Sequence, residues 1–141
     1  MKLYKSAMVK KESKLNIKNI NTTNIFTLVD LAISTSKIKN NINFTKNYDP
    51  SIPEFKLDAS SFIKTLNQVF DVFKDKENVT CSILLKIGEY IKIDEKKYSL
   101  ISVEISSNEK SDFSSLNIKE TNSFIITTDE TRITLDLPLI L

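Results

Sequence analysis

Histidine and tryptophan are absent from the 141 residues, and cysteine and glycine occur once each. Without histidine the chain lacks the commonest metal ligand and the commonest general base. A single cysteine, Cys81, excludes an internal disulfide and a cysteine-cluster metal site. A single glycine, Gly88, excludes a glycine-rich phosphate loop. The sequence therefore offers no familiar catalytic or metal-binding cluster, and for Cys81 itself we expect a buried, unreactive thiol in a strand.

The charge is nearly balanced, with a formal net charge of +2 and scattered lysines, so we expect no binding to nucleic acid. The N-terminal stretch is charged and has no apolar region, so we expect no signal peptide. No apolar run approaches the length that spans a membrane. A cytoplasmic protein without membrane contact is the expectation. The length predicts one domain over residues 15–141, preceded by a mobile segment over residues 1–14.

Residues 41–75 carry the strongest pattern in the chain. Ile42 and Phe44 alternate with polar residues, which predicts a half-buried strand. Two prolines within 48–54 restrict the backbone and predict an ordered turn. Asp58 is a good N-cap for a following amphipathic helix. The apolar stripe of that helix is Phe62, Ile63, Leu66, Val69, Phe70 and Phe73.

The remaining pattern predicts one earlier helix and several strands. We expect a short strand over 14–20 and a helix that Thr22 or Thr23 caps and that ends within 36–39. Unbroken alternation from Val79 to Ile87 predicts a strand, with a bend or bulge at Gly88. Further ranges, in order, are a turn at 94–96, a strand over 98–105, a loop over 106–122, and a final hairpin of strands 124–127 and 132–137.

Two amphipathic helices need one apolar sheet face to cover. The predicted fold is therefore an α/β (α+β) two-layer sandwich, in which a mixed sheet of about five strands carries the helices on one face.

The string NFTKNYDPSIPEFKLDASSFIKTLNQVF resembles the segment that leads into the N box of bacterial sensor histidine kinases. The run YDPSIPE is most similar to the nitrogen-regulation type, and the ending LDLPLIL is similar to the last strand of such kinases. The resemblance implies the ATP-binding fold of the GHKL ATPase superfamily. The alternative is a strand, a loop and a core helix in an unrelated α+β domain.

The resemblance also implies where the metal site of the family should lie. The N-box helix of the family carries two asparagines four residues apart, and the second coordinates Mg²⁺. Those positions are Gln68 and Val72 in this sequence, and Val72 has no oxygen that could bind a hard cation. If the alignment slips by one residue, Asn67 and Asp71 supply oxygens instead.

The adenine-binding box of the family, D-x-G-x-G, should follow the strand over 98–105. Ser107 stands in place of its aspartate, Asn108 matches the usual asparagine, and Glu109 and Ser111 replace the two glycines. Glycine there lets the backbone approach the nucleotide closely. The later glycine-rich lid is missing. Gln68, Ser107 and Asn108 are therefore the predicted remnants of a nucleotide pocket.

The sequence is compatible with three functions. The first is a degenerate kinase domain, a pseudoenzyme that binds no cofactor and acts as a regulatory or interaction module in two-component signalling. Its partner would be a response regulator or a kinase dimerisation domain. The second is a working Mg-ATP-binding domain that phosphorylates a partner histidine in trans. The third is an unrelated α+β domain that binds proteins.

Overall fold

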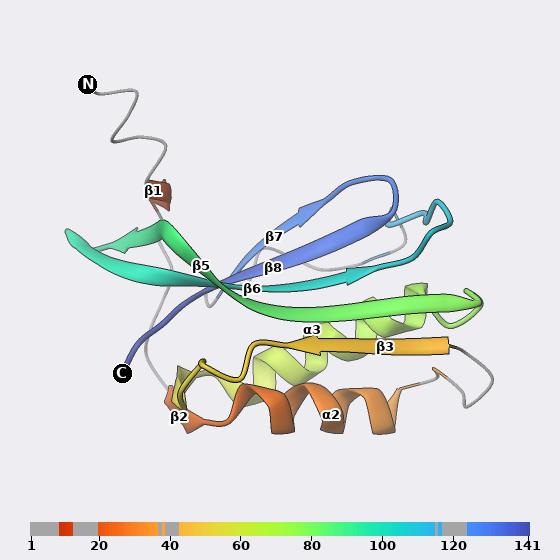
Figure 1. Ribbon diagram of the computed structural model, residues 1–141, viewed down its shortest axis with the longest axis horizontal. Coiled ribbons are helices and arrows are strands. Elements are labelled where there is room, and N and C mark those ends of the chain that lie inside the picture. The colour runs from red at the N-terminus through yellow and green to blue at the C-terminus, as the bar shows by residue number, and fades with distance from the viewer. Residues whose placement is uncertain (1–8, 13–19, 37, 39–42, 115, 117–123) are drawn as a thin grey trace.

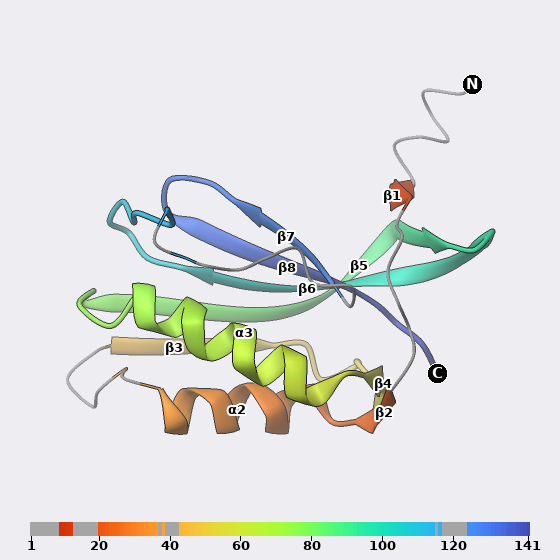
Figure 2. The same ribbon diagram turned by 180° about the vertical axis from the view of Figure 1, so that it is seen from behind.

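The structure is a computed structural model that describes residues 9–12, 20–36, 38, 43–114, 116 and 124–141. A twisted sheet forms one layer, and two helices lie on one side of it (Figures 1 and 2). The two-layer prediction is confirmed. The elements are β1 Val9–Glu12, β2 Asn21–Thr23, α2 Ile25–Thr35, β3 Asn43–Tyr48, β4 Phe55–Leu57, α3 Ala59–Val72, β5 Asn78–Ile93, β6 Lys96–Ser106, β7 Ile125–Thr128 and β8 Arg132–Pro138.

Strand β5 is the longest element and organises the sheet. Along one edge it pairs in parallel with β3 and, further on, with β1. Along its other edge it pairs with β6, which continues antiparallel to β8 and then β7. The described residues thus form a mixed sheet of six strands, and β2 and β4 form a separate antiparallel pair.

The core lies between the helices and the sheet. Most of the predicted stripe of α3 is buried there: Phe62, Leu66, Val69, Phe70 and Phe73 are all 0% exposed, whereas Ile63 is only half-buried. The sheet contributes one face of alternating apolar residues to this core, which includes Val79, Cys81, Ile83, Ile101, Val103, Ile105, Ile133, Leu135 and Leu137. Burial of a phenylalanine of this kind contributes about 1.5–3 kcal/mol, so α3 anchors the helix layer.

The start of α3 is as predicted, whereas the start of α2 is not. Asp58 Oδ1 accepts a hydrogen bond of 3.2 Å from the Ser61 amide, as an N-cap does. The prediction that Thr22 or Thr23 caps the first helix is wrong, because both belong to β2 and pair with β4. Asn24 is the cap, and its side chain accepts from the amides of Phe26 and Thr27.

The predicted irregularity at Gly88 is confirmed. The β5–β6 register shifts between Lys86 and Tyr90, and Gly88 has a φ of +84°, which an L side chain rarely adopts. The hairpin then turns through two residues, Asp94 and Glu95, rather than the three that we predicted. Both have positive φ, as the two-residue turn that matches strand twist requires.

Three short strands were not predicted. β2 and β4 have three residues each, too few for alternation to be recognised. β1 lies within the segment for which we predicted mobility. The strand predicted over 14–20 lies, apart from Ile20, outside the described residues.

Candidate functional site

The positions that the resemblance aligns with the metal site of the family lie on the last two turns of α3. Gln68 and Val72 are half-buried, and Val72 packs against the core. Asn67 points elsewhere, because its Oδ1 accepts a hydrogen bond of 3.3 Å from Thr35 of α2. A slip of one residue turns the selected pair by about 100° around the helix axis. The positions that the two alignments select therefore face different neighbours.

The alternative pair, Asn67 and Asp71, has partners of its own within the protein. Asp71 Oδ1 lies 3.6 Å from Lys74 Nζ on the same helix end. Asn67 is occupied by the contact to α2 described above. Across the described part of the chain, no group of three or more histidine, cysteine, aspartate or glutamate side chains could hold a metal ion.

The predicted adenine-binding positions lie in the loop that follows β6. Ser107 is buried, with 9% of its surface exposed. Its amide donates to the Thr131 carbonyl at 3.0 Å, and its Oγ accepts from the Glu109 amide at 3.3 Å. Asn108 is exposed. The Ser107 hydroxyl therefore stabilises the turn at the start of the loop, and the Ser107 amide links the loop to the β7–β8 connection.

Contacts across the loop bring it against the C-terminal end of α3. Lys76 Nζ donates a hydrogen bond of 2.8 Å to the Lys110 carbonyl and lies 3.8 Å from Glu109 Oε2. The Phe113 ring packs on the Phe73 ring, with centroids 5.7 Å apart. The structure thus brings the loop over 107–113 and the end of α3 together. No hydrogen bond joins Gln68 to Ser107 or Asn108 in the described residues.

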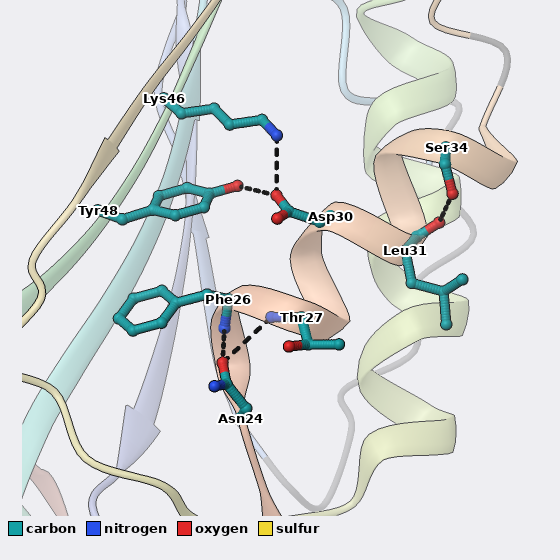
Figure 3. A network of polar contacts seen from close by, with 8 residues as sticks. All are labelled: Asn24, Phe26, Thr27, Asp30, Leu31, Ser34, Lys46 and Tyr48. Carbon is teal, nitrogen blue, oxygen red and sulfur yellow. Dashed lines mark hydrogen bonds and ion pairs between the residues drawn. The ribbon is translucent and has the colours of Figure 1, made fainter.

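A separate polar network joins α2 to the edge strand β3 (Figure 3). Asp30 Oδ1 accepts from Lys46 Nζ and from the Tyr48 hydroxyl, both at 2.9 Å. The Tyr48 ring stacks on Phe26, with centroids 5.5 Å apart. Burial, the neighbouring Cys81 and the Asp30 carboxylate raise the pKa of Tyr48 far above its usual value. The hydroxyl therefore remains a hydrogen-bond donor at neutral pH.

Cys81 lies on β5, in the register position opposite Lys46 of this network. It is fully buried, and burial raises the pKa of its thiol to about 12, against the smaller lowering effect of Lys46. A protonated, buried thiol is a poor nucleophile and a poor metal ligand. The structure thus agrees with the predicted unreactive core cysteine.

No protein-family model matches the chain, and no curated protein does. Several solved structures, however, are similar to the chain. The catalytic domain of the histidine kinase ThkA gives a TM-score of 0.54 at 16% identity, with 87% of this chain and 99% of that chain covered. The histidine kinase AdeS of Acinetobacter baumannii gives 0.53 at 8% identity, covering 86% and 68%. The histidine kinase domain of the E. coli osmosensor EnvZ gives 0.50 at 12% identity, covering 86% and 89%.

The chain has the fold of a histidine kinase catalytic domain. The match extends over most of the chain and over nearly all of the ThkA domain, so the similarity includes both the sheet and the helix layer. The fold class predicted from the sequence, a two-layer α+β sandwich like that of these kinase domains, is confirmed. At identities of 8–16% the likeness concerns the backbone and does not extend to the residues of the site.

Sequence reasoning missed Lys76 and Phe113, the two residues that join the loop to α3. Lys76 lies in a polar connection, and Phe113 is an isolated aromatic in a polar segment. Neither has periodicity, and both gain a partner only through the tertiary fold. Among the described helices, none combines the length and the apolar composition that crossing a membrane requires.

Proposed function

We propose that this kinase-like domain has lost its nucleotide site and acts as a regulatory or interaction module in two-component signalling. The observation that carries the proposal is Val72. It stands where the resembling kinases have the asparagine that coordinates Mg²⁺, and its side chain packs against the core. A hydrocarbon cannot replace an oxygen ligand of Mg²⁺, and without the metal the charge of a triphosphate is poorly compensated.

The loop after β6 supports the same proposal. The hydroxyl of Ser107 stands in place of the carboxylate that receives the adenine amino group, and a neutral acceptor gives about half the strength of a charged one. Glu109 adds a carboxylate on the side where polyphosphate would lie. Loss of one buried hydrogen bond to a charged group costs about 1.5–3 kcal/mol. A total of about 4 kcal/mol lowers affinity roughly a thousandfold.

The proposed partner is a protein: a response regulator or the dimerisation domain of a kinase. The similarity of YDPSIPE to nitrogen-regulation kinases is the reason that this proposal includes nitrogen regulation as the kind of signalling. The chain contains no histidine, so it cannot carry a phosphohistidine itself. If the domain does bind Mg-ATP, phosphoryl transfer would have to be to a histidine of another chain.

The test is calorimetric titration of the unaltered chain with Mg-ATP. We expect a dissociation constant no tighter than millimolar. A low-micromolar constant would overturn the proposal and favour a divergent, working kinase domain. Incubation with labelled ATP should leave the chain without acid-labile label, whereas such label on an added dimerisation domain would favour the working kinase.

A restored variant serves as the matched control. It carries Val72→Asn, Ser107→Asp, Glu109→Gly and Ser111→Gly, which reinstate the family residues on the same scaffold. We expect measurable weak binding for this variant, provided that circular dichroism shows the fold is retained. Single restorations should do little, because deficits within one site need not add.

A further inference from the structure

One peptide group in the loop after β6 is held from two sides. The Lys110 carbonyl accepts from Lys76 Nζ at 2.8 Å, and Lys76 follows the end of α3. The amide of the same peptide group, that of Ser111, donates to the Glu130 carbonyl at 2.8 Å, in the β7–β8 connection. A single peptide plane thus bridges the helix layer and the last hairpin. Hydrogen bonds at both ends of one peptide polarise each other.

The side chain of Lys76 is directed to the loop and is less exposed than that of a typical surface lysine. Its side chain is only 20% exposed, against 39% for Lys74 two residues earlier. Lys74 pairs with Asp71 on its own helix end, while Lys76 reaches across to the loop. Within the loop, the Glu109 carboxylate forms an ion pair with the Lys76 ammonium at 3.8 Å, and Glu109 is half exposed. The short bond to the carbonyl is therefore the main contact.

We propose that Lys76 is a latch, a positioning residue that holds the loop over 107–113 closed against the C-terminal end of α3. Phe113 on Phe73 supplies the apolar part of the closure. This inference rests on the proposed function in one respect: the region between α3 and this loop is where the resemblance puts the nucleotide.

The test is amide hydrogen exchange of the ¹⁵N-labelled chain followed by NMR, without nucleotide. The variant is Lys76→Met, which keeps the apolar stem and removes the ammonium. We expect the Ser111 amide to exchange at least about tenfold faster, the lower end of the range that loss of one hydrogen bond from a charged donor gives. Amides in the middle of β6 and β8 should keep their rates, which shows that the change is local.

Three variants make the result specific. Lys74→Met removes the neighbouring ammonium and should leave the Ser111 rate unchanged. Glu109→Gln keeps the bond to the carbonyl and should change the rate less than twofold, because a pair at 3.8 Å with an exposed partner is weak. Lys76→Arg retains a charged donor and should keep most of the protection. If Lys76→Met does not fold, Lys76→Gln removes the charge with a shorter polar side chain and should also accelerate Ser111 exchange.

An unchanged Ser111 rate in a folded Lys76→Met chain overturns the latch. So does an equal acceleration in Lys74→Met, which would indicate a general loosening of the helix end. Because no nucleotide is present, these outcomes are independent of the Mg-ATP titration. The latch can fail while the nucleotide site is lost, and the nucleotide site can prove functional while the latch holds.

Discussion

The Tyr48 hydroxyl donates a hydrogen bond of 2.9 Å to Asp30 Oδ1 and so ties the edge strand β3 to helix α2. Lys46 Nζ reaches the same oxygen from two residues away on the strand, at 2.9 Å (Figure 3). An inward-pointing lysine on an edge strand also discourages pairing with another chain. Tyr48 and Lys46 thus hold the edge strand against α2 and disfavour its pairing with a strand of another chain.

This relationship predicts a loss of stability at alkaline pH. The pKa of Tyr48 is raised in the folded state above its ordinary value of about 10, first by burial. A raised folded pKa means that the stabilisation is fully present below about pH 10 and is lost as the pH rises further. The pKa of Cys81 is also raised in the folded state, from about 9 to about 12, so its contribution to stability is likewise lost as the pH rises through that range. Urea unfolding at pH 8 and pH 11 should therefore show a smaller decrease in unfolding free energy for Tyr48→Phe than for the unaltered chain. Equal decreases would contradict the assignment.

Phe70 should be among the most costly residues to truncate. Its ring is fully buried and meets Phe44 of β3 edge-on, with centroids 6.1 Å apart. Phe70→Ala should lower the unfolding free energy by about 3–5 kcal/mol, from lost burial and the cavity left behind. Leu31→Ala is the matched control, because Leu31 is 47% exposed on α2, and we expect a change within about 0.5 kcal/mol. A loss below about 1 kcal/mol for Phe70→Ala in denaturant unfolding would show that the core face is misplaced.

The β5–β6 turn should gain stability from a glycine. Glu95 has a φ of +70°, a conformation that costs a non-glycine residue about 1–2 kcal/mol, whereas glycine loses about 0.5–1 kcal/mol in chain entropy. Glu95→Gly should thus raise the melting temperature, with a gain of about 0.5–1 kcal/mol. The ion pair to Lys92 that it removes is long and exposed, so its loss is small.

Asp94→Gly is the control for this turn. Asp94 also has positive φ, but aspartate tolerates that region better than glutamate does. Its gain should therefore be smaller than that of Glu95→Gly. A destabilised Glu95→Gly chain would argue that the turn has another conformation in solution.

The sequence predicted those parts of the fold that repeat. The helix stripe from Phe62 to Phe73 and the alternation from Val79 to Ile87 extend over enough residues for the period to be recognised. The cap of α2 was mistaken because Thr22, Thr23 and Asn24 are all good N-caps, and only the pairing of β2 with β4 distinguishes them. Lys76 was missed because its partner is a backbone carbonyl 34 residues away, which no side-chain pattern records. The assignment of Gln68, Ser107 and Asn108 to a vestigial pocket stays a prediction.

The two parallel strands on one edge of β5 constrain the order in which this sheet can assemble. The β5–β6 ladder grows from a two-residue turn, so it closes with little loss of chain entropy. The β3 ladder, in which Asn43 meets Asn78, closes a longer stretch of chain that contains α3. The β1 ladder pairs Val9 with Tyr90 and closes about eighty residues of chain. Pairings between residues distant in sequence form slowly. We therefore expect the β5–β6 hairpin to form early in folding and the parallel pairings of β3 and β1 with β5 to form late.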